Sequence, residues 1–317
     1  MSLHPQAEAL LNAFKVRNLP PLEDLGDIGA ARALYTESSK VLSLSEDIYE
    51  VEDRTILGYS KEITIRIYSP NENPVVPALV YFHGGGWVIG NIDTHDALCR
   101  SFANEAGCKV ISVDYGLAPE NKFPVPVEDA YLATKWVSDH AVELGVDSKR
   151  IAVGGDSAGA NLAAVVCYLS NQRKGPEISH QLLFYPSTTF EPTESYEKYS
   201  EGYYLTKATM KWFGEQYFSM PSETQSPLAA PMLIPDEEAA LLPPAYIVTA
   251  EYDPLCDGGE KYASKLSEAG VKTTYICYPG MIHGFMSMTA PLESGRTAIK
   301  ESARYLKREH QQAVENK

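Results

Sequence analysis

Short apolar segments rich in β-branched and aromatic residues recur along the chain from residue 78 onward. They span 78–86, 108–116, 150–157, 180–186, 245–253 and 273–280. Apolar runs of this length are typical of strands that are buried on both faces of a parallel sheet. Most are separated by helical segments, and strand–helix alternation with right-handed crossovers favours an α/β architecture. We therefore expect a mostly parallel, doubly wound sheet that binds its ligand at the carboxyl ends of the strands.

Two segments before this alternation have a different pattern. Residues 48–56 and 61–70 alternate between apolar and polar positions. Alternation of this kind predicts strands that have one exposed face or that pair in antiparallel fashion.

Two further stretches contain no predicted strand. Residues 1–45 have an amphipathic helical pattern that Pro20-Pro21 interrupts. An aromatic-rich helical segment at 203–218 interrupts the alternation of strands and helices later in the chain. We predict N-terminal cap helices over 1–45 and a main domain over 46–317 with a cap insertion at about 187–242. The alternative is that these helices cover one face of the sheet.

Composition narrows the possible functions. The net charge of −15 over 317 residues disfavours nucleic acid and anionic membrane surfaces as partners. The N-terminus has no basic segment followed by an apolar run, and no stretch is long enough to span a membrane. The five cysteines are scattered and have no CxxC spacing, so we expect reduced thiols in a cytoplasmic protein, with neither a disulfide framework nor a metal site.

The segment 151–161, IAVGGDSAGAN, runs from an expected strand directly into an expected helix. It contains the spacing Gly-x-Ser-x-Gly at Gly155, Ser157 and Gly159. A strand-to-helix turn this tight strains its central residue, and glycines on either side leave room for the backbone to fold back. The pattern predicts that the Ser157 hydroxyl is exposed at the apex, where it can act as a nucleophile.

A serine nucleophile needs a base at the carboxyl end of another strand. Of the seven histidines, His283 follows the last apolar run directly and precedes a glycine. His180 opens a strand at its amino end, and His310 lies in a polar terminal helix. We therefore expect His283 to be the base.

The histidine in turn needs a carboxylate to orient it. The preceding strand ends in Glu251, Asp253 and Asp257. We favour Asp253, because Pro254 forces it out of helical geometry. Glu251 is the second candidate, and Asp257 is expected to cap the next helix. The resulting order of serine, aspartate and histidine is that of α/β-hydrolases.

Three consecutive glycines, Gly84, Gly85 and Gly86, follow the first apolar run. Their backbone N–H groups, with that of Ala158, are the expected donors of an oxyanion hole. His83 is expected to orient this loop. A phosphate-binding loop is disfavoured because the sequence has neither the Lys-Ser/Thr ending of a P-loop nor a GxGxxG spacing.

Five motifs occur in a fixed order: HGGGWVIG, DYGLAPENKFPVPVEDA, GDSAGAN, DPLCDGG and HGF. With them the chain resembles the α/β-hydrolase esterases of the hormone-sensitive-lipase group, from about Asp47 to the terminal helix. The resemblance implies an α/β-hydrolase catalytic domain with a sheet of about eight strands and a helical cap. It also implies hydrolysis of small carboxylic esters with short to medium acyl chains through an acyl-serine. We expect no cofactor, and a homo-oligomer is compatible with the sequence.

The chain departs from the family pattern at several loop positions. Gly116 stands where arginine is usual, and Asn121-Lys122 replace a histidine–proline pair. Cys256 and Gly258 replace arginine and glutamate. These changes bear on loop rigidity and leave the predicted catalytic residues untouched. An amidase or deacetylase with the same triad and a catalytically silent receptor are the alternative functions; the presence of the histidine argues against the receptor.

Overall fold

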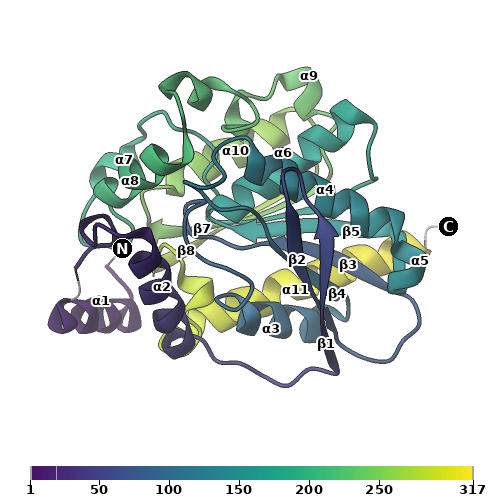
Figure 1. Ribbon diagram of the computed structural model, residues 1–317, viewed down its shortest axis with the longest axis horizontal. Helices are drawn as coiled ribbons and strands as arrows, with labels where there is room; N and C mark the ends of the chain where they lie inside the picture. The colour runs from purple at the N-terminus through teal and green to yellow at the C-terminus, as the bar shows by residue number, and fades with distance from the viewer. Residues whose placement is uncertain (1, 19, 316–317) are drawn as a thin grey trace.

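An eight-stranded sheet forms the centre of the molecule (Figure 1). A computed structural model describes residues 2–18 and 20–315. Strand order is β1-β2-β4-β3-β5-β6-β7-β8; β2 pairs antiparallel with β1 and β4, and the other neighbours are parallel. Each strand lies largely in a segment expected from the sequence. The strands are β1 (Glu50–Leu57), β2 (Glu62–Ser69), β3 (Val76–Phe82), β4 (Lys109–Asp114), β5 (Val146–Asp156), β6 (Gln181–Phe184), β7 (Ala245–Tyr252) and β8 (Thr273–Ile282).

Helices cover both faces of the sheet, which confirms the doubly wound arrangement (Figure 1). Helices α4, α5, α6 and α10 lie on one face, and α3 and α11 lie on the other. Their bounds are α3 (Asp96–Ala106), α4 (Val125–Asp139), α5 (Ala141–Leu144), α6 (Ala158–Arg173), α10 (Cys256–Glu268) and α11 (Glu293–Glu315). A short 3-10 helix, η4 (Phe285–Ser287), lies between β8 and α11.

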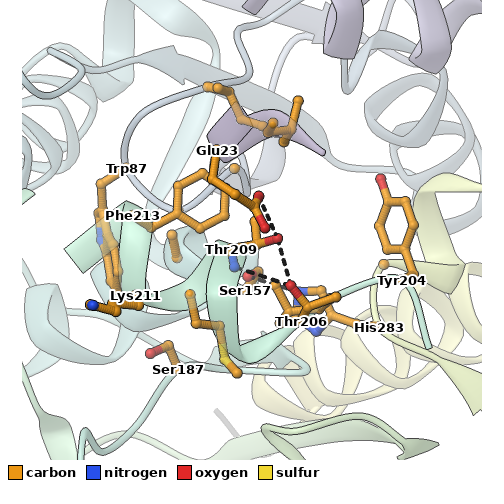
Figure 2. A pocket seen from close by; sticks show the side chains of 18 of the residues that line it. Glu23, Trp87, Ser157, Ser187, Tyr204, Thr206, Thr209, Lys211, Phe213 and His283 are labelled. Atoms are coloured by element: carbon orange, nitrogen blue, oxygen red, sulfur yellow. Dashed lines mark hydrogen bonds between the residues drawn. The ribbon is translucent and has the colours of Figure 1, made fainter. Parts of the chain in front are cut away.

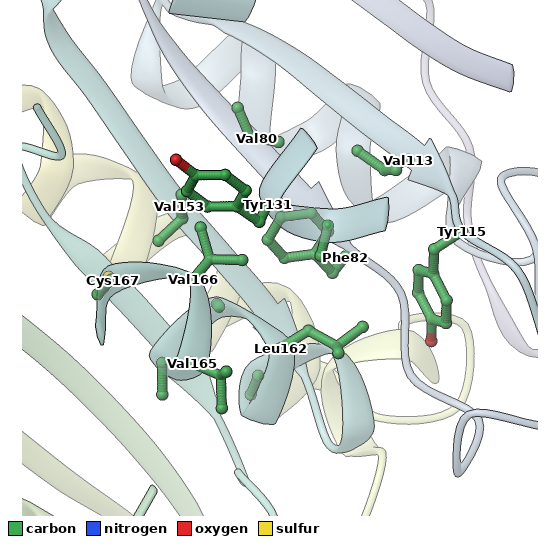
Figure 3. Packing of buried hydrophobic residues seen from close by; sticks show 14 of the residues in the cluster. Val80, Phe82, Val113, Tyr115, Tyr131, Val153, Leu162, Val165, Val166 and Cys167 are labelled. Carbon is green, nitrogen blue, oxygen red and sulfur yellow. The ribbon is translucent and has the colours of Figure 1, made fainter. Parts of the chain in front are cut away.

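Strand β3 shows why the buried strands are continuous apolar runs. Val80 and Phe82 belong to the cluster that packs against α4 and α6, as Figure 3 shows. Leu79 and Tyr81 belong to the cluster on the opposite face, against α3 and α11. All four side chains are fully buried. Because both faces of the strand are covered, every position along it is apolar.

Most helices of the two segments predicted as a cap gather at one side of the molecule, whereas α9 (Asp236–Ala239) lies apart from them, beside α10 (Figure 1). The first contains α1 (Pro5–Arg17), η1 (Leu22–Asp24) and α2 (Ile28–Leu42). The second contains α7 (Glu194–Lys198), α8 (Lys207–Tyr217), η2 (Pro221–Gln225), η3 (Pro231–Leu233) and α9 (Asp236–Ala239). The segments touch each other where the Thr209 hydroxyl donates to Glu23, at 2.9 Å.

The helix predicted at 203–218 is shorter than expected. Helix α8 begins at Lys207 because the Thr206 hydroxyl caps it by accepting from the Thr209 N–H at 3.1 Å. Tyr204 has φ +81°, which is incompatible with a helix. A side-chain cap of this kind fixes the first turn of a helix.

Candidate active site

Ser157 stands at a sharp turn between β5 and α6. Its backbone has φ +55° and ψ −117°, a conformation that non-glycine residues rarely adopt. A Cβ on Gly159 would lie 1.9 Å from the Phe82 carbonyl oxygen, and one on Gly155 would lie 2.4 Å from it. Only glycine fits at either flank. The turn thus raises the serine above the carboxyl ends of the strands, as the Gly-x-Ser-x-Gly spacing predicted.

His283 links Ser157 to Asp253. The His283 Nε2 lies 2.9 Å from the Ser157 Oγ, and its Nδ1 lies 2.7 Å from the Asp253 Oδ2. Asp253 is fully buried, and its second oxygen accepts the Leu255 N–H at 2.9 Å. The Tyr185 ring packs edge-on against the imidazole, with centroids 4.9 Å apart. With the Nδ1 proton directed at the carboxylate, Nε2 is left to accept the serine proton.

The other acidic candidates have different partners. The Glu251 carboxylate accepts the Gly280 N–H at 2.7 Å, in the segment of β8 that leads to His283. The expectation that Asp257 caps α10 is wrong, since the N-cap is Leu255. Asp257 instead lies in the first turn, and its carboxylate accepts the Ser195 N–H at 2.7 Å. It therefore joins α10 to α7.

The three glycines after β3 do not all face the serine. Gly85 and Gly86 line the cavity together with Ser157 and Ala158. Both have positive φ, +117° and +60°. The N–H of Gly84, by contrast, donates to the Asp156 carboxylate at 2.9 Å. Its assignment as an oxyanion donor is therefore wrong, because a buried carboxylate already occupies that N–H.

Asp156 is the centre of a buried polar cluster beneath the glycine loop. Besides the Gly84 N–H it accepts the Tyr81 hydroxyl at 2.8 Å and contacts the His95 Nε2 at 3.2 Å. Burial by itself would raise the pKa of Asp156, but interactions with His95 and Tyr81 outweigh it, and the net pKa is lowered. The sequence motifs predicted no role for Asp156, Tyr81 or His95. A carboxylate inside the Gly-x-Ser-x-Gly turn was the only signal available.

His83 holds the same loop from the other side. Its Nδ1 lies 2.7 Å from the Gly84 carbonyl oxygen, and its ring stacks on Tyr115 with centroids 4.4 Å apart. The Tyr115 hydroxyl donates to the His83 carbonyl at 2.7 Å. Burial lowers the pKa of His83 to about 3, so the ring is neutral near pH 7.

Comparison with known proteins agrees with this geometry. A family model described as alpha/beta hydrolase fold (Abhydrolase_3) matches residues 79–287. The chain belongs to the α/β-hydrolase family. It is 38% identical over 294 residues to the carboxylic ester hydrolase LipN of Mycobacterium tuberculosis, covering 90% of this chain and 78% of LipN. It is 36% identical over 309 residues to the ethyl acetate hydrolase of Pseudomonas putida, covering 92% and 95% of the two chains.

A solved structure extends the similarity over the whole fold. The hyperthermophilic esterase from Pyrobaculum calidifontis superimposes with a TM-score of 0.92 at 44% sequence identity. The match covers 97% of this chain and 98% of that one. These relatives place the chain among the carboxylesterases of the α/β-hydrolase family.

The hydrolase has a cavity of about 960 Å³ that opens onto Ser157 and His283 (Figure 2). Its walls come from α1, α2, η1 and α8 as well as from the loops after the strands. Phe213 lies directly over the glycine loop, since a Cβ on Gly86 would lie 2.2 Å from its ring. Tyr196, Tyr204 and Phe213 of the second cap segment are among the aromatic residues that line the cavity. Tyr199 and Tyr203 pack at a tilt against the Tyr252 ring, with ring centroids 5.2 Å apart in each pair.

Arg32 ties α2 of the hydrolase to the glycine loop. Its Nε donates to the Val88 carbonyl at 2.8 Å, and one terminal nitrogen donates to the Ala118 carbonyl at 2.9 Å. The guanidinium also forms a bidentate pair with Glu120, at 2.9 and 2.7 Å. The N-terminal segment is therefore fastened to the loop that faces Ser157.

Residues 2–18 and 20–315 contain neither a candidate metal site nor a helix that could span a membrane. No group of three or more His, Cys, Asp or Glu side chains in that part of the hydrolase is arranged to hold a metal ion. Within the same residues, none of the helices has the length and apolar character needed to cross a bilayer.

Proposed function

We propose that this carboxylesterase hydrolyses short- to medium-chain esters through an acyl intermediate on Ser157. The observation that carries the proposal is the hydrogen-bonded chain from Ser157 through His283 to Asp253, with links of 2.9 and 2.7 Å, at the floor of an apolar cavity. A base placed this close to a serine hydroxyl is the arrangement that makes the hydroxyl nucleophilic.

In this proposal His283 takes the Ser157 proton as Oγ attacks the ester carbonyl carbon. Asp253 holds the imidazole in the required tautomer and stabilises its charged form. The N–H groups of Gly85, Gly86 and Ala158 donate to the oxygen that becomes negative. The tetrahedral intermediate then collapses, and the alcohol leaves with the proton held by His283. Water, activated by the same histidine, releases the acid and restores Ser157.

We assign residues 1–45 and 187–242 to a cap that shapes the acyl site. Support comes from the cavity walls, to which α1, α2 and α8 contribute, and from the bond between Thr209 and Glu23 that joins the two segments. We also assign the protein to the cytoplasm, supported by its five free cysteines.

The proposed substrate range follows from the cap. Phe213, Tyr196 and Tyr204 give the cavity rigid aromatic walls. Each methylene that fits contributes up to about 0.8 kcal/mol of burial, whereas a chain that outgrows the cavity gains nothing further and clashes with its wall. The specificity constant kcat/KM should therefore rise and then fall with acyl length.

The test is a series of p-nitrophenyl esters from two to sixteen carbons, kept below micelle formation, with p-nitroacetanilide included. We expect a maximum between about two and eight carbons and an anilide rate lower by several orders of magnitude. A kcat/KM that climbs through sixteen carbons would identify a lipase instead. An anilide rate comparable to the ester rate would identify an amidase.

A further inference from the structure

Two cysteines outside the active site lie close together. Cys256 opens α10 and Cys277 lies in β8, and their sulfur atoms are 3.9 Å apart. They are separated by 21 positions in the sequence, so the fold creates this proximity. Cys277 is exposed, and Cys256 is half-buried behind it. Cys256 is also one of the positions where the chain departs from the family pattern.

The surroundings favour a reactive thiolate at Cys277. The Cys256 S–H interacts with the Cys277 sulfur and lowers the pKa of Cys277 to about 7. The same contact raises the pKa of Cys256. Near pH 7 the Cys277 thiol is therefore more readily ionised than an ordinary cysteine, whose pKa is about 8.5. An exposed thiolate next to a second thiol is the usual environment of an oxidisable pair.

The other three cysteines provide an internal comparison. Cys99, Cys108 and Cys167 are buried, and burial raises the pKa of each. Thiols that are both buried and protonated react poorly with oxidants. Among the five cysteines, oxidation should therefore occur first at Cys256 and Cys277.

We propose that Cys256 and Cys277 form a reversible disulfide when the protein meets a hydroperoxide. The Cys277 thiolate attacks one peroxide oxygen; the S–O bond forms, the O–O bond breaks, and the departing oxygen leaves as water when the oxidant is hydrogen peroxide. The Cys256 sulfur then attacks the resulting sulfenic acid at sulfur. The S–S bond forms, the S–O bond breaks, and the Cys256 proton leaves in a second water. Two thiols and one hydrogen peroxide thus give one disulfide and two waters.

The geometry allows this bond with a small movement. A disulfide needs its sulfurs about 2.05 Å apart, so the two atoms must approach by somewhat less than 2 Å. Cys277 lies beside Thr249 in the sheet, and the Cys256 sulfur is already 3.8 Å from the Thr249 hydroxyl. The bond would tie the first turn of α10 to β8.

The test treats the reduced, full-length protein with a small excess of hydrogen peroxide. We expect titratable thiols under denaturing conditions to fall from five to three. Peptide mapping should find Cys256 joined to Cys277 with the loss of two hydrogens, and dithiothreitol should restore both thiols.

Two single variants serve as matched controls. Cys277→Ser should abolish the disulfide and the fast alkylation by iodoacetamide at pH 7. Cys256→Ala should leave Cys277 modifiable but several-fold slower, because the side-chain donor that lowers its pKa is gone. It should accumulate a sulfenic acid that dimedone traps.

Three results would overturn the proposal. They are disulfide-linked dimers in place of an internal bond, irreversible sulfinic acid at Cys277 in the wild-type protein, and alkylation in Cys256→Ala as fast as in the wild type.

Discussion

Replacing Asp156 tests whether the buried cluster beneath the glycine loop supports catalysis. The carboxylate is 3% exposed and contacts Tyr81, Gly84 and His95 at 2.8, 2.9 and 3.2 Å. A hydrogen bond to a charged group contributes about 1.5–3 kcal/mol, and removing one partner of a buried charged cluster costs about 3–5 kcal/mol. Asp156→Ala should therefore lower the free energy of unfolding by about 3–5 kcal/mol. Asp156→Asn keeps one acceptor oxygen and should lower it by about 1–3 kcal/mol.

The kinetic effect follows from the Gly84 N–H. When its acceptor is lost, the loop that carries Gly85 and Gly86 is no longer held at its first residue. Loss of one oxyanion donor typically costs about 10²–10³ in kcat, and partial misplacement should cost less. We expect Asp156→Ala, which removes the acceptor, to lower kcat by about ten- to a hundredfold with a smaller change in KM. In Asp156→Asn the amide oxygen can still accept the Gly84 N–H, so kcat should fall less.

The assay combines urea unfolding with steady-state kinetics on p-nitrophenyl butyrate. The pKa of Asp156 is lower in the folded protein than in the unfolded chain, where it is about 4. The carboxylate therefore stabilises the fold fully above pH 4, and this contribution is lost as the pH falls through the folded pKa. Both assays are run at pH 7.5, where the contribution is complete. Asp93→Asn is the matched control. That carboxylate pairs with Arg66 at 2.7 Å but is 62% exposed, and its loss should cost less than about 1 kcal/mol. A folded Asp156→Ala variant with wild-type kcat would contradict a role of this carboxylate in holding the glycine loop.

Three further predictions concern other parts of the molecule. Arg32→Ala should lower the free energy of unfolding, measured in urea, by about 1–2 kcal/mol, because the Val88 and Ala118 carbonyls lose their donor. Arg32→Lys should recover only part of that loss. If both variants were as stable as the wild type, Arg32 would not fasten α2 to the glycine loop. Burial, with smaller contributions from His180 and Arg150, lowers the pKa of His310 to about 3. As the pH drops below about 6.5, the imidazole is protonated in the unfolded chain but not in the folded protein, so the free energy of unfolding falls. His310→Asn should reduce that loss by about 1 kcal/mol between pH 7 and 5.5, and an unchanged pH slope in urea titrations would argue against a neutral buried imidazole. Asp253→Asn should lower kcat, measured at saturating ester, by about 10⁴, while Glu251→Gln should lower it less than tenfold. The opposite ranking would identify Glu251 as the carboxylate that orients His283.

Local pattern was sufficient for the strands and for the candidate triad. Strand β3 is apolar at successive positions because both faces are covered, and Ser157 lies in a turn whose glycines are required by the Phe82 carbonyl. Each of these features depends on a short segment. Chain order alone then indicated that His283 and the β7 carboxylates meet at one edge of the sheet.

Contacts between residues far apart in the sequence could not be predicted from local pattern. The Gly84 N–H is directed away from the serine by Asp156, which lies 72 positions later. Arg32 reaches the glycine loop over 56 positions. Asp257 is paired with Ser195 and so does not cap its own helix. Each of these partners is chosen by packing, for which the sequence carries no periodic signal.

Covalent labelling of the nucleophile directly tests whether Ser157 carries the acyl intermediate. A radiolabelled organophosphate should add one equivalent per chain, abolish ester hydrolysis at the same rate as it is incorporated, and map by peptide analysis to Ser157. Ser157→Ala should take up no label and keep the wild-type unfolding transition, while Ser187→Ala, which alters another serine of the same cavity, should label normally. Label on any other residue, or ester hydrolysis within tenfold of wild type in Ser157→Ala, would contradict the proposed mechanism.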